Sequence, residues 1–324
     1  MEILFLAIIF LFAAIFSFFL TKHIIAKMKN EKIVGQDMHK EGKPEVAEMG
    51  GMAVVGAFLA TALIGSLLYM NFGIAFSLEG MVAALLVIAI TALIGTYDDI
   101  HDIRQSVKAA LPLLASAPLV AIALMWGNNS ISIPFLGMVD FGLLYPLLLI
   151  PLAVAVCSNL TNMLAGFNGL EAGMGIIIFA ALCALAIMQG QNEMALICAA
   201  MMGALLGFIY FNWYPAKIFI GDVGTFTIGA AIAAAVIVSS FKSAGVILMA
   251  PFIVDWFIKA YNKFPKSFAI LKDGKLYAPE GKIRGLVDLV LKIFGGMRER
   301  NLVLCLLGIE AVIAVIVVVV FGSS

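Results

Sequence analysis

The chain has 324 residues, of which 63% are hydrophobic and 12% are charged, and its formal net charge is zero. Soluble globular proteins carry about 25% charged residues, so this composition excludes a soluble domain and predicts a membrane protein with several spanning helices. The zero net charge says nothing about binding partners, because basic and acidic residues are unevenly distributed along the chain.

Segments of about 20 mainly apolar residues, long enough to cross the hydrocarbon core, predict ten helices without an internal repeat. In chain order they cover residues 2–21, 51–70, 81–97, 107–126, 143–158, 170–188, 193–213, 219–240, 244–262 and 302–322. The first segment lacks a preceding basic region and a small-residue cleavage site, so we expect a spanning helix rather than a signal peptide. The predicted fold is one all-α polytopic membrane domain over residues 1–324.

Lysine and arginine orient these helices, because short cytoplasmic loops carry an excess of positive charge. The segments that directly follow the first, third and seventh helices, with Lys108 at the start of the fourth, and the ninth helix with its following loop hold every basic residue except Lys242. This distribution predicts a multi-pass protein of the cell membrane with both termini outside.

Three polar clusters fall on the predicted cytoplasmic side, at residues 98–102, 158–173 and 220–224. Polar groups scattered by chance would fall on both faces, whereas one active site facing the cytoplasm would gather them on one. An ion-coupled transporter is the alternative from another class. Its substrate site is expected near the membrane midplane, often at broken helices in repeated halves.

The first cluster contains the adjacent carboxylates Asp98 and Asp99. Such carboxylates suit Mg²⁺, which takes oxygen ligands and often shares them with substrate phosphates. A solvated acidic loop is the alternative reading of the same residues. In the third cluster, Asp222 opens an apolar helix, where an acidic residue can also serve as an N-terminal cap.

The second cluster gathers Asn159, Asn162, Asn168 and Glu171 in one short segment. Asparagine side chains offer a carbonyl oxygen to a metal, or a paired donor and acceptor to a nucleobase. The alternative is a helix-breaking turn in which Asn and Gly act as caps, but four polar groups exceed what one turn needs.

Two acidic residues lie within predicted spans. Asp255 can reach Lys259 four residues later on the same helix, which favours a structural ion pair. Glu310 has no basic partner nearby in the sequence. Hydrogen bonding inside the bundle and an ion pathway both stay open for it.

The last cytoplasmic loop, residues 263–301, is predicted to form a small appendage. Residues 267–272 and 275–277 flank Asp273-Gly274, a pair that favours the type I′ turn of a β-hairpin. Apolar residues then recur at helical spacing over 283–294 among basic ones. This pattern predicts an amphipathic helix on the anionic inner leaflet.

Several specific motifs follow one another along nearly the whole chain: GQDMHKEGKPEVAEMGG, the Asp98-Asp99 pair, NLTNMLAGFNGLEAG, FIGDVG and RERNLVLCLLGIE. Together they resemble the polyprenyl-phosphate N-acetylhexosamine-1-phosphate transferases, and within them the archaeal and eukaryotic dolichyl-phosphate N-acetylglucosamine-1-phosphate transferases. The resemblance implies a ten-helix enzyme that moves N-acetylglucosamine 1-phosphate from its UDP-sugar onto a polyprenyl phosphate and releases UMP. Such a reaction is the first membrane step of glycan assembly, as in N-glycosylation.

The same resemblance implies roles for individual residues. Asn162 and Asp222 would hold Mg²⁺ beside the diphosphate, with Mn²⁺ as an alternative ion. Lys108 would contact the phosphates. Asp98 and Asp99 would position or activate the lipid phosphate. Phosphoryl transfer needs neutralised charge and aligned reactants more than it needs covalent chemistry by the protein, so these residue types suit the reaction.

Further residues are implied to bind substrate. Asn168 would face the uracil, with Asn159 in the same segment, and Glu48 would lie near the nucleoside or sugar. Lys263 and Lys266 stand where the eukaryotic branch has an Arg-His-Arg cluster, and either could clamp a phosphate as a point charge. The alternative for both lysines is attraction of anionic lipid headgroups.

The expected partners are a UDP-sugar, a polyprenyl or dolichyl phosphate and membrane lipids. No nucleic acid is expected, and a homodimer stays open. The bacterial branches of the family have aspartate in place of Asn162 and a histidine-rich late loop, whereas the histidines here are His23, His39 and His101. The resemblance therefore favours N-acetylglucosamine over the muramoyl-pentapeptide substrate.

Overall fold

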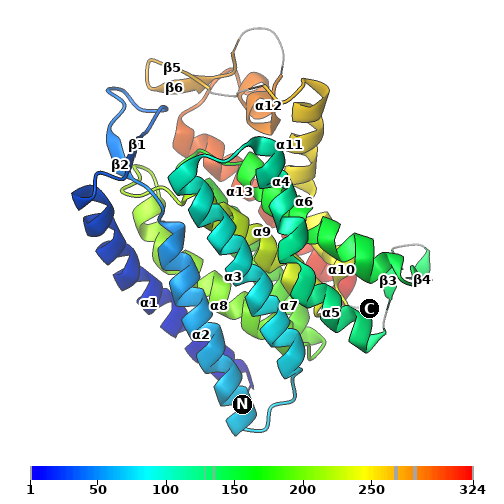
Figure 1. The fold of residues 1–324 in the computed structure, drawn as a ribbon. Helices are drawn as coiled ribbons and strands as arrows, with labels where there is room; N and C mark the ends of the chain where they lie inside the picture. Colours follow the sequence, from blue (N-terminus) through cyan, green and yellow to red (C-terminus); the bar gives the residue numbers. More distant parts are fainter. Residues whose placement is uncertain (1, 128, 134–135, 266–268, 280–282, 323–324) are drawn as a thin grey trace.

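The computed structural model describes the chain except for residues 1, 128, 134–135, 266–268, 280–282 and 323–324 (Figure 1). In chain order the helices are α1 (Glu2–Asn30), α2 (Gly51–Asn71), α3 (Leu78–His101), α4 (Gln105–Ala115), α5 (Ala117–Trp126), the π-helical turn η1 (Tyr145–Leu149), α6 (Ile150–Met163), α7 (Leu170–Met188), α8 (Asn192–Asn212), α9 (Gly221–Ile237), α10 (Lys242–Leu248), α11 (Ala250–Tyr261), α12 (Leu286–Ile293) and α13 (Glu299–Gly322). Three antiparallel hairpins pair β1 (Val34–Gln36) with β2 (Glu45–Ala47), β3 (Ser130–Ile133) with β4 (Gly137–Asp140), and β5 (Ile270–Lys272) with β6 (Lys275–Tyr277).

Every predicted spanning segment contains helix. Within the described part of the chain, eight helical spans are long and apolar enough to cross a membrane, and α10 with α11 forms a ninth that is bent by 58°. Helix α9 is apolar but shorter, at 17 residues. The prediction of an all-α polytopic membrane protein is confirmed. The ninth segment is not the single helix predicted over 244–262, because the chain breaks at Met249 and Pro251 opens the next helix without a backbone N–H.

Helix α9 lies inside the bundle and positions the polar residues described below. It packs against α2, α3, α6 and α8, and all of its residues from Val223 to Ile237 are buried. An apolar surface on every side is what a helix buried all round requires. Gly95 lets α3 approach closely, since a Cβ atom there would lie 2.6 Å from the carbonyl oxygen of Asp222. The last turn of α3 therefore meets the first turn of α9.

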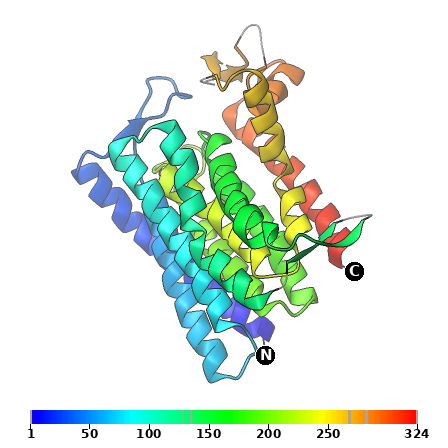
Figure 2. The same ribbon diagram turned by 45° about the vertical axis from the view of Figure 1, so that its right-hand side comes forward.

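One end of the bundle carries the β1–β2 and β5–β6 hairpins and α12, and both termini lie away from it (Figures 1 and 2). We call this the site end. The β1–β2 hairpin connects α1 to α2 and was not predicted. It is tied to the chain before α9, because the backbone N–H of Phe219 donates to the carbonyl oxygen of Ala47 at 2.8 Å. The hairpin loop is thereby held beside the start of α9.

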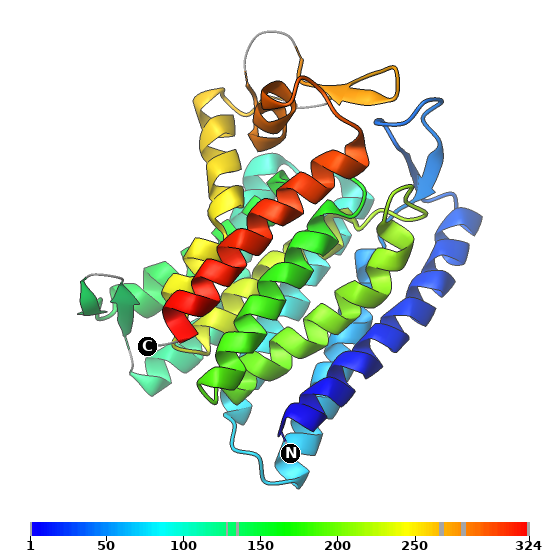
Figure 3. The same ribbon diagram turned by 180° about the vertical axis from the view of Figure 1, so that it is seen from behind.

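The predicted hairpin of the appendage is confirmed in its described part. Asp273 and Gly274 have φ angles of +50° and +69°, as a type I′ turn requires. Helix α12 forms inside the predicted helical segment, but its apolar side packs against α11, β6 and α13 (Figure 3). Leu286, Val287, Val290 and Leu291, which were predicted to lie on the inner leaflet, are buried by protein, whereas Phe294 is exposed.

Candidate active site

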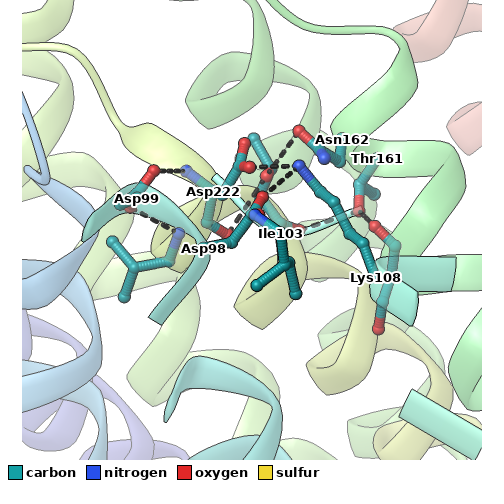
Figure 4. Close-up of polar contacts among 10 residues, drawn as sticks. Asp98, Asp99, Ile103, Lys108, Thr161, Asn162 and Asp222 are labelled. Carbon is teal, nitrogen blue, oxygen red and sulfur yellow. Dashed lines mark hydrogen bonds and ion pairs between the residues drawn. The ribbon is translucent and has the colours of Figure 1, made fainter. Parts of the chain in front are cut away.

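Four predicted site residues from four helices meet at the site end (Figure 4). Lys108 of α4 places its Nζ 2.5 Å from Asp98 Oδ2 of α3 and also pairs with Asp222 Oδ2 of α9. Asn162 of α6 lies 2.9 Å from both Lys108 Nζ and Asp222 Oδ1 when its amide nitrogen faces the carboxylate. Residues separated by more than 100 positions in the sequence therefore form one hydrogen-bonded cluster, as the sequence analysis predicted from their shared side of the membrane.

The two adjacent aspartates have different surroundings. Asp98 Oδ1 accepts a hydrogen bond from the backbone N–H of Ile103 at 2.9 Å, and its other oxygen faces Lys108. Asp99 accepts from the backbone N–H groups of Asp222 and Val223 at 2.8 and 3.0 Å. Asp99 is therefore the N-terminal cap of α9, supplied by a different helix, which leaves the Asp222 side chain pointing at Lys108.

Gly221 makes this cap possible. Its φ angle is +70°, and a Cβ atom built on it would lie 2.7 Å from Asp99 Oδ2. A side chain at this position would have to adopt an unfavourable backbone conformation and push Asp99 away. The glycine before Asp222 thus allows the carboxylate of Asp99 to reach the first turn of α9.

A cavity of about 270 Å³ opens beside this cluster. At one end it is lined by Asn162, Asp222 and Thr225, and at the other end by Asn168 and the β1–β2 loop. The α6–α7 loop forms part of its wall and is held by Glu171, whose Oε1 accepts from the backbone N–H of Gly166 at 2.5 Å. The cavity can therefore take a ligand that has a charged group at one end and a polar group at the other.

At the far end of the cavity, and directly behind its wall, Asn168 contacts residues for which no role was predicted, although they lie inside three of the quoted motifs. Asn168 donates to Asp37 and Glu299, and Lys40 pairs with both of these carboxylates. His39 stacks on Phe167, with ring centroids 4.5 Å apart and an interplanar angle of 8°. Burial of the His39 ring lowers its pKa below the usual value of 6.5, although Glu299 and Asp37 oppose this shift.

Three of the predicted substrate residues, all of them in the described part of the structure, do not line this cavity. Asn159 faces a neighbouring groove, and Glu48 is half-buried beside β1, where burial and the charge of Asp99 raise the pKa of its carboxyl group. Lys263 is exposed. Lys266 lies outside the described residues. The phosphate contact expected of Lys263 stays a prediction, because this residue is exposed and does not line the cavity.

The intramembrane acids also have defined surroundings. Asp255 pairs with Lys259 at 2.7 Å and accepts from the backbone N–H of Leu286 at 2.8 Å, so the predicted ion pair is confirmed. This pair holds α11 against the start of α12. Glu310 is buried, and neither carboxylate oxygen has a hydrogen-bond partner among the described residues.

A second, apolar groove of about 510 Å³ runs between α4, α6 and α11. Leu113, Leu152 and Ile253 are among the residues that line it. Ala109 and Asn159 also line the groove. Ala109 follows Lys108 in the chain, and Asn159 lies one helical turn before Asn162, so the groove ends beside the charged cluster.

The oxygen donors of the cluster suit Mg²⁺. No group of three or more His, Cys, Asp or Glu side chains converges as a metal site in the described part of the chain. Magnesium in phosphate-transferring sites, however, is often held by one or two protein oxygens together with waters and substrate phosphates. Asp222 and Asn162 supply a carboxylate and an amide oxygen at the cavity wall, so the donor types fit, provided that the Asn162 amide turns its oxygen toward the ion.

Comparison with known proteins adds independent information. The glycosyl transferase family 4 pattern matches residues 81–240. A protein of Saccharolobus solfataricus, provisionally named UDP-N-acetylglucosamine–dolichyl-phosphate N-acetylglucosaminephosphotransferase, is 38% identical over 323 residues, which are 98% of each chain. The Dictyostelium discoideum protein of that name is 26% identical over 85% of this chain and 78% of its own. The phospho-N-acetylmuramoyl-pentapeptide-transferase of Limosilactobacillus fermentum is 34% identical over 74% and 76% of the two chains.

Proposed function

The chain belongs to glycosyl transferase family 4, and from this membership we propose that it transfers N-acetylglucosamine 1-phosphate from UDP-N-acetylglucosamine to dolichyl phosphate or a related polyprenyl phosphate. UMP is the second product. Two relatives that are 38% and 33% identical over 98% and 92% of this chain are provisionally named for this activity. The transporter alternative has no support in these relatives.

The observation that carries the proposal is that a polar cavity and an apolar groove meet beside the charged cluster. The polar cavity beside Asp222 and Asn162 suits a nucleoside diphosphate sugar, and the apolar groove beside Asn159 suits a prenyl chain. Lys108 lies at the junction, where the phosphates of both substrates would meet. A reaction between a water-soluble nucleotide and a membrane lipid requires this arrangement. The nucleotide must bind from the water and the lipid from the bilayer, with their phosphates held next to each other.

The residues at the junction suit a direct transfer. An oxygen of the lipid phosphate attacks the phosphorus that bears the sugar, a new P–O bond forms, and the bond to UMP breaks. Lys108 would orient the phosphates, and Asp98 would hold its ammonium group in place. The carboxylate oxygens of Asp98 and Asp99 accept hydrogen bonds from Lys108 or backbone N–H groups, and neither residue lines the cavity, so both suit positioning roles better than that of a covalent nucleophile.

We further propose that Asp222 and Asn162 bind Mg²⁺ together with the diphosphate, with Mn²⁺ as the alternative ion. When bound, the ion supplies positive charge that neutralises the diphosphate and the developing charge on UMP. The site end would face the cytoplasm and both termini would face outside, since nearly all lysines and arginines lie in the loops of the predicted cytoplasmic side or in the helical turns next to them.

The test is a reconstitution with purified protein, UDP-N-acetylglucosamine, dolichyl phosphate and Mg²⁺, in which released UMP is measured. Release should require the lipid phosphate and should stop when the metal is chelated. Lys108→Met should abolish release, whereas Glu41→Gln, an exposed change in the β1–β2 loop, should not. Absence of UMP with both Mg²⁺ and Mn²⁺, and with prenyl chains of several lengths, would contradict the proposal.

A further inference from the structure

Asn168 is held in a closed ring of polar contacts at the far end of the cavity. Its backbone N–H donates to Glu299 Oε1 at 2.8 Å, and its Nδ2 donates to Asp37 Oδ2 at 3.0 Å. Lys40 completes the ring by pairing with Asp37 Oδ2 at 3.1 Å and with Glu299. The ring joins the β1–β2 loop, the α6–α7 loop and the start of α13, which all lie at the site end (Figure 3).

This ring fixes which way the Asn168 amide points. An ionised carboxylate only accepts hydrogen bonds, so the group that faces Asp37 must be the NH₂ of the amide. The carbonyl oxygen Oδ1 then lies on the other side of the amide. No hydrogen bond to this oxygen comes from any residue that the structure describes, and Asn168 lines the cavity. Asn168 therefore presents its Oδ1 to a ligand as an acceptor, whereas one N–H of its amide and its backbone N–H are already occupied by carboxylates.

Asp37 itself is held firmly. Its second oxygen, Oδ1, accepts from the backbone N–H of His39 at 3.2 Å, and the residue is only 4% exposed. Lys40 places its ammonium group 3.1 Å from the other oxygen, Oδ2. With both oxygens engaged, the carboxylate cannot rotate to release the amide of Asn168, and a fully satisfied network of this kind is rigid.

The two ends of the cavity define how a nucleotide would lie in it. The phosphates belong at the end with Asp222, Asn162 and the Lys108 cluster, so the base reaches the end with Asn168. Uracil carries an N3–H donor at the middle of its hydrogen-bonding edge, whereas cytosine carries a bare acceptor nitrogen at the same position. An acceptor held toward the base can accept a hydrogen bond from N3–H of uracil. It forms no hydrogen bond with the ring nitrogen of cytosine, which is itself an acceptor.

We propose that Asp37 determines the nucleobase selectivity of this site: by holding the NH₂ group of Asn168, it aims the amide oxygen at N3–H of uracil and so discriminates against cytosine. This inference rests on the proposed function, since it assumes that the cavity binds the nucleotide of a UDP-sugar. Asp37 acts through Asn168 and is a positioning residue. A site that presents an acceptor binds a base with a donor at that position. It rejects a base with an acceptor there, because the two buried acceptors stay without a hydrogen bond.

The experiment measures dissociation constants of UDP and CDP for the purified full-length protein in neutral detergent with Mg²⁺. The wild type should prefer UDP by at least about tenfold. In Asp37→Ala the amide of Asn168 can turn, so the preference should fall about tenfold or more, with CDP binding as tightly as before or more tightly. Glu41→Gln, an exposed change in the same loop, should keep the wild-type preference.

An equal loss of UDP and CDP binding in Asp37→Ala would overturn the inference, because it would show that Asp37 only maintains the loop. If the Asp37→Ala variant does not fold, a binding measurement on the wild-type protein still tests the inference. UDP methylated at N3 has no donor there and should bind at least about tenfold more weakly than UDP; equal binding would also overturn the inference. UMP release in the same preparation separates the two proposals, since an active enzyme without base preference refutes only this inference.

Discussion

Asp99 provides the sharpest test of how the cluster is built. The structure shows it accepting two backbone N–H groups of α9 rather than facing the cavity. We predict that Asp99→Ala destabilises the protein and displaces Asp222. Loss of an N-terminal cap costs about 1 kcal/mol, and loss of a second hydrogen bond to a charged acceptor costs about 2 kcal/mol, so the sum is about 3 kcal/mol.

This free energy converts into a measurable shift of the thermal midpoint. With an unfolding entropy of about 2 cal/mol/K per residue, a chain of 324 residues should lose roughly 4–5 °C. Activity should fall much further. A displacement of about 1 Å at a phosphate-binding carboxylate costs on the order of 100-fold in rate. Thermal unfolding in detergent and UMP release measure the two effects on the same sample.

Asp99→Asn and Asp102→Asn form a matched pair. Asparagine at 99 can keep one acceptor but must turn its NH₂ group toward the other N–H, so it should also lower the thermal midpoint. Asp102 is exposed and ends α3 with a φ angle of +46°, which asparagine tolerates, so its variant should behave like the wild type. An Asp99→Asn protein with the wild-type midpoint but no activity would refute the capping role and favour a chemical one.

Further predictions concern the metal site, the topology and pH. Asn162→Ala and Asp222→Ala should each abolish UMP release without unfolding the protein, and wild-type activity in either would remove that residue from the proposed metal site. In a cysteine-free background, a cysteine at Gln105 should react with impermeant reagents only from the cytoplasm and one at Gln189 only from outside; the reverse pattern would invert the topology. The pKa of His39 is lowered in the folded state. At pH values between this lowered pKa and 6.5, His39 therefore binds a proton more readily in the unfolded state than in the folded state. The thermal midpoint should therefore drop as pH falls below about 6.5, and less so in His39→Gln; parallel curves would contradict this.

The sequence was sufficient to locate the apolar spans and to place the charged site residues on one side of the membrane, for a physical reason. Apolar length is set by bilayer thickness, and loop charge sets orientation, so both are local properties of the chain. Once the helices are oriented, the predicted site residues Asp98, Lys108, Asn162 and Asp222 fall at one end of the bundle. The tilt and close approach that bring them into contact depend on small residues such as Gly95, whose role is visible only in the packed structure.

The contacts that the sequence did not predict join residues far apart in the chain. Asp37 and Asn168 are separated by 131 positions, and Lys40 and Glu299 by 259. Asp37, Lys40 and Glu299 look like ordinary charged residues when read alone, and the role predicted for Asn168 did not include them. The cap of α9 was missed for a related reason. Caps normally come from the residue that precedes the helix, so the sequence pointed to Asp222, whereas the carboxylate comes from Asp99 on another helix.

The arrangement of Lys108 explains how the same residues can serve both the structure and a substrate. Its ammonium group lies between Asp98 and Asp222, and Asp99 adds a third carboxylate nearby, so the cluster keeps an excess of negative charge. Such a cluster repels phosphates unless more positive charge enters it. The carboxylate of Asp222 is the one that lines the cavity, so it is the one that an entering cation can reach. Lys108 would then keep Asp98 as its partner and turn its remaining N–H donors to the phosphates at the junction, where the apolar groove ends.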